Sequence, residues 1–201
     1  MNLVERAKNI IITPKTEWDV VKSESITINE IFTKYVLLLA LIPTVAGFIG
    51  QSLIGVSLGP FGYFRVPIGS GILYLILYYL LSVGSIYIIA LIVDALAPSF
   101  GSKKDLIASL KVVAYSFTPF WVAGIFLIFP IIGILTFIGG LYSLFLMYLG
   151  LQKVKDTTQD KLVGYFVVVI IVSIVVIAII QWIVNLIALG GIMMEGFKSS
   201  Y

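Results

Sequence analysis

The side chains that most often carry catalytic chemistry are missing from this chain. Its 201 residues include no cysteine and no histidine, which excludes thiol nucleophiles, imidazole bases and the usual zinc or haem ligands. No paired carboxylates or catalytic triad stand out, and Gly69-Ser70-Gly71 lacks the lysine and the spacing of a phosphate loop. We therefore expect a protein that is not an enzyme and uses no metal or cofactor; an enzyme built on this sequence would have to rely on Asp94, tyrosines or serines.

Asp94 is the one acidic residue inside a long apolar stretch, Ile88-Ala97. Ionisable side chains are costly inside a membrane and often mark functional sites. Near the C-terminus of a helix, a carboxylate also faces the negative end of the helix dipole, so Asp94 should need a cation, and Lys103, Lys104 and Lys111 are the nearest candidates. It could form a structural ion pair that holds a loop, act in a proton or ion relay, or serve a binding role specific to its family.

Three further polar side chains fall in apolar stretches. Gln181 and Asn185 are four residues apart and would share one helix face, and Gln51 lies in an earlier stretch. Hydrogen bonds between helices would account for all three. The alternative is a polar path through a small transporter or channel, which requires Asp94, Gln181 and Asn185 to converge on one water-accessible cavity.

The elements that must position these residues are apolar helices. The chain is 60% hydrophobic and 11% charged, whereas soluble domains have about 45–50% apolar and about 25% charged residues. Four charge-free runs are long enough to cross a membrane: Tyr35–Phe64, Val66–Val93, Val112–Gln152 and Leu162–Met194.

The third run, Val112–Gln152, is too long for one span, because as a single helix it would be about twice as long as the hydrocarbon core is thick. Phe129-Pro130 breaks it, since proline cannot continue a helix and restricts its predecessor. We expect an all-α polytopic transmembrane helix bundle with spans at about 32–58, 67–96, 112–129, 131–151 and 164–189.

Positive charge is distributed unevenly among the segments that flank and connect these spans. Five crossings place all but two of the 13 Lys and Arg residues on one side of the membrane. That side holds Arg6, Lys8, Lys15, Lys22, Lys34, Lys103, Lys104, Lys111, Lys153, Lys155 and Lys161, and the other side holds Arg65 and Lys198. Since cytoplasmic loops carry the excess of Lys and Arg, we expect the N-terminus in the cytoplasm and the C-terminus outside.

Residues 1–31 are expected to form a cytoplasmic amphipathic segment at the membrane interface, followed by the membrane domain, 32–195, and a short external tail, 196–201. Apolar residues fall at helical spacing in its first part (Leu3, Val4, Ala7, Ile10 and Ile11); an irregular tail is the alternative. Thr13-Pro14 is typical of a helix start, and Thr27 with Glu30 matches a capping box. Glu17 and Asp19 are expected to be solvated.

Several stretches resemble the bacterial branch of the Yip family, the Ypt/Rab-interacting-protein-like membrane proteins. They are Ile11–Trp18, Asp94–Gly101, Ala108–Lys111, Ala114–Pro119 and Leu151–Tyr165. The most widely shared part is Tyr-Ser-x-x-Pro, which Tyr115, Ser116 and Pro119 match; Asp94 and Pro98 match the bacterial branch. The resemblance implies a bundle of about five spans with a cytoplasmic N-terminus.

The resemblance does not extend to the partners of eukaryotic members, which bind prenylated Rab-type GTPases. The segment before the first span is short, and the chain has no Asp-Leu-Tyr-Gly-Pro motif, so we expect no GTPase partner.

We expect a non-enzymatic interaction or membrane-organising protein of the prokaryotic inner membrane. Its partners would be membrane lipids together with other membrane proteins or further copies of itself, and not nucleic acid. The candidate motif residues are Asp94, Pro98, Lys103, Tyr115, Ser116 and Pro119. The alternative function is a small transporter or channel that uses Asp94.

Overall fold

The chain is an all-α polytopic membrane protein, as its composition predicts. A computed structural model describes residues 2–57 and 62–198. Within them, five helical stretches are long and apolar enough to cross a membrane: Ile28–Ile54, Ile68–Phe100, Leu106–Ile128, Pro130–Lys153 and Gln159–Ile187. The last residues of the expected external tail, 199–201, lie outside the described part of the chain.

The helix of the first span begins at the capping box, as the sequence predicts, a few residues before the expected span boundary at about residue 32. The Thr27 hydroxyl accepts a hydrogen bond from the Glu30 N–H and the Glu30 carboxylate accepts one from the Thr27 N–H, each at 3.2 Å, so two orphan donors are satisfied at the helix start. The span then runs through α3 (Ile28–Ile31), the π-helical η1 (Phe32–Val36), α4 (Leu37–Phe48) and the π-helical η2 (Ile49–Ile54).

A short hairpin links the first two spans at one end of the bundle. Strands β1 (Val56–Ser57) and β2 (Tyr63–Phe64) pair antiparallel. The second span follows as α5 (Ile68–Leu96), which ends in the 3₁₀ turn η4 (Ala97–Phe100). We refer to this end of the molecule as the hairpin end.

Pro130 divides the following stretch as the sequence predicts, and Pro119 adds a second break before it. Pro119 stands in the first turn of α7 and separates α6 (Leu106–Ser116) from α7 (Thr118–Ala123). After the 3₁₀ helix η5 (Gly124–Ile128), the extended Phe129 turns the chain, and η6 (Pro130–Ile132) leads into α8 (Leu135–Lys153). The last helix, α9 (Gln159–Lys198), has 40 residues.

Two short helices precede the first span and form what we call the N-terminal arm, residues 2–27. The Asn2 side chain caps α1 (Leu3–Ile12) by accepting from the Val4 and Glu5 N–H groups. Helix α2 (Pro14–Ser23) starts with Pro14 in its first turn, but the Thr13 hydroxyl makes no cap and instead donates to the Asn9 carbonyl at 3.1 Å.

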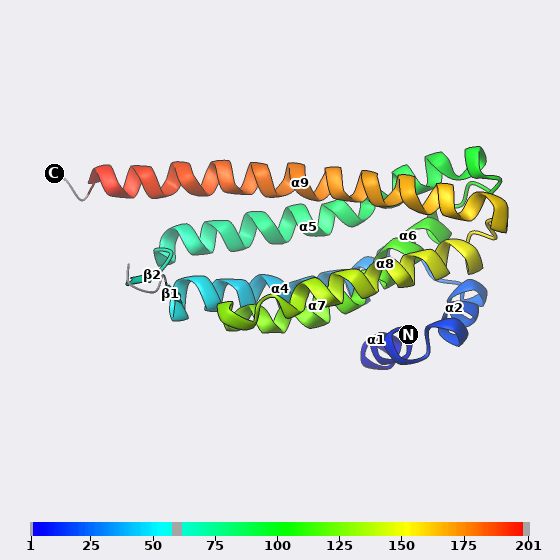
Figure 1. The fold of residues 1–201 in the computed structure, drawn as a ribbon, viewed down its shortest axis with the longest axis horizontal. Helices are drawn as coiled ribbons and strands as arrows, with labels where there is room; N and C mark the ends of the chain where they lie inside the picture. Colours follow the sequence, from blue (N-terminus) through cyan, green and yellow to red (C-terminus); the bar gives the residue numbers. More distant parts are fainter. Residues whose placement is uncertain (1, 58–61, 199–201) are drawn as a thin grey trace.

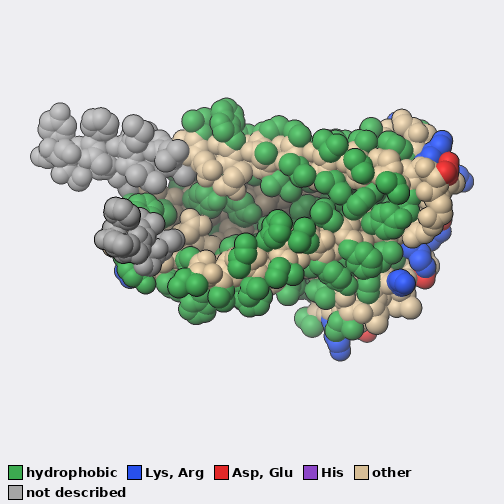
Figure 2. Space-filling view, in the orientation of Figure 1, with side chains coloured by type: hydrophobic (Ala, Val, Ile, Leu, Met, Phe, Trp, Pro, Cys, Tyr) green, Lys and Arg blue, Asp and Glu red, His purple; other side chains and the backbone are tan. Residues whose placement is uncertain are grey.

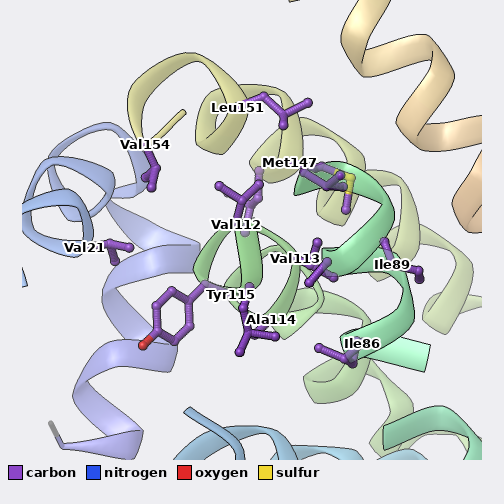
Figure 3. Packing of buried hydrophobic residues seen from close by; sticks show 14 of the residues in the cluster. Val21, Ile86, Ile89, Val112, Val113, Ala114, Tyr115, Met147, Leu151 and Val154 are labelled. Carbon is purple, nitrogen blue, oxygen red and sulfur yellow. The ribbon is translucent and has the colours of Figure 1, made fainter. Parts of the chain in front are cut away.

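The helices form two layers that are joined at one end (Figure 1). Helix α9 lies alongside α5, whereas α7 packs on α4 and α8 packs on α7 and α6. The layers converge where the N-terminal arm lies, opposite the hairpin end. The buried core is centred on α6, from which Val113 points toward Ile86 and Ile89 of α5 while Tyr115 points toward the N-terminal helices (Figure 3).

Charged side chains gather at the end where the layers converge (Figure 2). We call this region the polar end; it consists of the N-terminal arm and the loops 97–105 and 154–158. The long faces between the two ends are covered with apolar side chains, which suits helices surrounded by lipid.

Candidate functional site

Arg6 of α1 is a buried cation at the polar end, with 7% of its surface exposed. Its Nη1 donates to Glu17 of α2, and its Nη2 donates to the Glu24 carboxylate at 2.5 Å. Its Cζ also lies 5.4 Å from the centroid of the Tyr115 ring, within range of a cation–π interaction. Arg6 therefore connects α1 to α2 and connects both of them to α6.

The acidic residues of α2 are thus not both solvated, as the sequence led us to expect. Glu17 is buried beside Arg6. Asp19 is exposed, but its two carboxylate oxygens accept from the Lys153 ammonium at 2.8 Å each. Spacing along α2 does not distinguish the two residues, because burial of Glu17 depends on how the arm lies against the bundle.

Lys111 of α6 connects α2 to the membrane domain. It is buried on α6, and its ammonium donates to the backbone carbonyls of Val21 and Glu24. A cation that binds the last carbonyls of a helix also compensates the negative end of its dipole. Lys111 therefore caps the C-terminus of α2.

The Tyr-Ser-x-x-Pro motif of Tyr115, Ser116 and Pro119 supports the arm from inside the bundle. The ring of Tyr115 is fully buried, and its centroid is 4.8 Å from that of Tyr35 in an edge-to-face pair. The Tyr35 hydroxyl lies 2.7 Å from the Thr118 hydroxyl, which donates to the Tyr115 carbonyl. Ser116 is also buried, and its hydroxyl has no hydrogen-bond partner among the described residues.

Two glycines of α8 allow close packing near this motif. A Cβ atom on Gly139 would lie 2.6 Å from the Pro119 carbonyl oxygen, so α7 and α8 can pack this closely only with glycine at that position. On the same helix, a Cβ on Gly150 would lie 3.0 Å from the ring of Trp18, which brings α2 against α8. Tyr115, Ser116 and Pro119 thus act through packing and not through an exposed surface.

Asp94 is at the centre of a second network, where the α5–α6 and α8–α9 loops meet. Its Oδ1 accepts from the Asp105 N–H at 2.7 Å, from the Ser109 hydroxyl at 3.1 Å and from the Lys155 ammonium at 3.3 Å. The start of α6 supplies the positive end of a helix dipole, which offsets the unfavourable position of Asp94 at the C-terminal end of α5.

The prediction of which lysine pairs with Asp94 was wrong. Among the described residues its ion pair is with Lys155, and not with Lys103, Lys104 or Lys111. Lys111 is two residues beyond Ser109 and therefore about 200° around α6 from it, so it faces the N-terminal arm. Lys103 contributes only its backbone carbonyl, which accepts from the Lys155 ammonium at 2.8 Å.

The ammonium of Lys155 is almost completely enclosed, with 1% of the side chain exposed. It also donates to the Asp105 carbonyl at 3.3 Å. Burial lowers the pKa of Lys155, while the hydrogen bond and the charge of Asp94 oppose this effect. Pro98, Lys103 and Lys104 lie around this network with exposed side chains.

The other intramembrane polar residues lie far from Asp94. Gln181 donates to the Tyr74 hydroxyl of α5 at 3.2 Å, a bond between two helices, and to the Asn185 side chain at 3.1 Å within α9. Tyr74 and Asp94 are on the same helix, about 30 Å apart along its axis. Gln51 is exposed near the hairpin end. The polar residues therefore do not converge on one cavity.

The polar end thus contains two networks whose central members sequence reasoning missed. Arg6 joins Glu17 and Glu24 of the same arm to Tyr115 of α6, and Lys155 reaches Asp94 from a distant loop. The only sequence signal was the clustering of charge at the ends of the apolar runs. Among the described residues, no group of three or more His, Cys, Asp or Glu side chains could hold a metal ion.

Comparison with known proteins agrees with the resemblance noted from the motifs. The family model described as the Yip1 domain matches residues 8–190. The chain is 23% identical over 151 residues to the inner membrane protein YohC of Escherichia coli strain K12, and equally to YohC of Escherichia coli O6:H1 strain CFT073, covering 74% of this chain and 77% of each relative. No solved structure matches the chain.

Proposed function

Because the chain belongs to the family of Yip1-domain membrane proteins, we propose that it is a non-enzymatic protein of a prokaryotic inner membrane, which binds membrane proteins or lipids through its polar end. Its relatives are named as inner membrane proteins. The uneven distribution of Lys and Arg supports a cytoplasmic N-terminus, so the polar end would face the cytoplasm and the C-terminus would lie outside.

One observation carries this proposal: the N-terminal arm is fixed to the bundle, yet it presents apolar side chains outward. Val4 is 73% exposed and Ile12 is 65% exposed, and Lys8 lies between them on the same face of α1. Such a face suits the boundary between lipid headgroups and acyl chains, or the surface of a partner in the membrane. Since buried contacts hold α1 in place, the arm would meet its partner without first becoming ordered.

Unpaired positive charge lies on the arm, on the α5–α6 loop and at the start of α9. Among the described residues, none of five exposed lysines forms an ion pair: Lys8, Lys15, Lys103, Lys104 and Lys161. Each basic residue close to a membrane surface contributes about 1 kcal/mol of attraction to anionic lipid. The exposed charge therefore supports contact with the anionic inner leaflet or with an acidic partner.

The alternative of a small transporter or channel has less support. It needs Asp94 and the polar residues of α9 to line one water-accessible cavity. However, Tyr74, the partner of Gln181, is about 30 Å from Asp94 along α5. Asp94 also accepts three hydrogen bonds from groups of the protein itself.

The experiment is crosslinking in the membrane, followed by purification in mild detergent and mass spectrometry of the proteins and lipids recovered. Arg6→Met would release the arm, and Arg65→Met at the hairpin end is the matched control. We expect a reproducible set of partners that Arg65→Met retains and Arg6→Met loses. Identical recovery from all three proteins would contradict a role for the arm.

A further inference from the structure

A cavity of about 450 Å³ lies between the two layers, enclosed by α5, α7, α8 and α9. Figure 2 shows this face of the molecule hollowed between α9 and the layer below it. Its walls are mostly aromatic and aliphatic, among them Phe120 and Trp121 of α7, Met147 of α8 and Ile174 of α9. Its volume falls within the range of ligand pockets, about 300–1,000 Å³.

The serines in these walls add little polarity. Each donates its hydroxyl hydrogen to a carbonyl of its own helix: Ser82 to Tyr79, Ser85 to Ser82, Ser143 to Gly139 and Ser173 to Val169, at 2.6 to 3.0 Å. A bound water needs about two to four polar partners, so these walls do not favour a file of water or a hydrated ion. They favour an apolar occupant.

The cavity is elongated along the helix axes. On α9 its lining extends from Ile170 to Gln181, about 16 Å at 1.5 Å per residue. Tyr74, the hydrogen-bond partner of Gln181, lies about 9 Å from the start of α5 at Ile68, and the 29 residues of α5 reach about 44 Å, the thickness of a bilayer with its headgroups. Since each headgroup layer is about 6 Å deep, Gln181 lies just inside the boundary of the hydrocarbon core, at the depth of the ester groups of a phospholipid.

Polar groups are found at this end of the cavity. Gln181 is bonded to Tyr74 and Asn185, and Tyr78 stacks on Tyr74 with ring centroids 5.8 Å apart. The Tyr78 hydroxyl makes no hydrogen bond within the described part of the chain, so it is free to donate to a carbonyl oxygen.

We propose that this cavity binds one acyl chain of a phospholipid from the leaflet on the hairpin side, with the ester carbonyl of that chain beside Tyr78 and Gln181. The chain would run inward between α5, α8 and α9 and fill the space between the two layers. This site is separate from the polar end, so it does not depend on the proposed interaction function.

The test uses the full chain in vesicles of phosphatidylethanolamine and phosphatidylglycerol, with a trace of phospholipid that carries a photoactivatable diazirine in the middle of one acyl chain. Gly140→Leu fills the cavity, since a Cβ there would meet only the Phe120 ring, at 3.8 Å. Gly84→Leu is the matched control: Gly84 is exposed on α5, and a Cβ there would meet nothing within 4 Å. Mass spectrometry locates the labelled peptides.

We expect labelling concentrated on the walls at 78–86, 137–147 and 170–181. Gly140→Leu should reduce it about tenfold, the change that about 1.4 kcal/mol produces, and Gly84→Leu should leave it unchanged. With the diazirine moved beside the ester, Tyr78→Phe should reduce labelling about fivefold, as expected for one hydrogen bond of about 1 kcal/mol.

Two results would overturn the proposal. Labelling spread evenly over all outward-facing helices, and equal in both leucine variants, would show only the general lipid environment. Labelling of the outward-facing helices with none on the cavity walls would show that acyl chains do not enter the space.

Discussion

The guanidinium of Arg6 lies over the ring of Tyr115, with Cζ 5.4 Å from the ring centroid. This contact joins the first helix of the chain to the motif that the Yip family shares most widely. It gives a physical reason for a tyrosine inside α6: the ring supports a cation whose other partners, Glu17 and Glu24, belong to the arm. The motif therefore fixes the position of the N-terminal arm.

Arg6→Met should release the arm. It leaves Glu17 buried without a counterion, and breaking a buried ion pair in this way costs about 3–5 kcal/mol. We expect a lower thermal unfolding temperature in detergent and faster tryptic cleavage after Lys8 and Lys15. Arg65→Met removes only one exposed hydrogen bond, to the Ile54 carbonyl, and should change the free energy of unfolding by no more than about 1 kcal/mol. Equal protease resistance of both variants would contradict this role of Arg6.

Asp94 and Lys155 should behave as one unit. Asp94→Asn leaves a buried ammonium without its counterion, and Lys155→Met leaves Asp94 without its cation. We therefore expect the double variant to lose less free energy of unfolding than the sum of the single variants, with a coupling of about 0.5–3 kcal/mol. The same cycle with Lys103→Met should show no coupling, and additive effects for Lys155 would refute the pairing.

Neighbouring glycines on α8 should respond oppositely to the same substitution. Gly139→Ala places a Cβ 2.6 Å from the Pro119 carbonyl oxygen and should destabilise by about 1–3 kcal/mol through overpacking. Gly140→Ala meets only ordinary contact distances and should be neutral or stabilising by up to about 1 kcal/mol, because alanine favours the helix. Thermal unfolding of the two purified variants decides between these outcomes.

The proposed orientation can be tested directly because the chain contains no cysteine. We expect a membrane-impermeant maleimide to label Tyr63→Cys, at the hairpin end, when it is added from outside. Lys104→Cys, at the polar end, should be labelled only after the membrane is permeabilised. Both side chains are exposed in the protein, so the reverse pattern would place the N-terminus outside.

Much of the fold could be predicted because it follows from local sequence. Charge-free runs indicate the spans, Pro130 divides the longest of them, and the capping box at Thr27 marks where the first begins. The contacts of the polar end could not be predicted in this way. Whether Lys111 or Lys155 reaches Asp94 depends on the rotation of α6 about its axis and on the path of a distant loop, and neither is encoded in spacing along one helix.

The contact between Gly150 and Trp18 has a consequence for sequence variation in the family. With the ring of Trp18 and the side chain of Val112 in place, a Cβ at position 150 would lie 3.0 Å from each of them, so the three positions share a fixed volume. Relatives that keep the arm docked in this way should vary at these sites together: a bulkier residue at position 150 would be tolerated only with smaller ones at positions 18 and 112. Covariation of positions 18 and 150 would therefore distinguish relatives with a docked arm from those that have lost it.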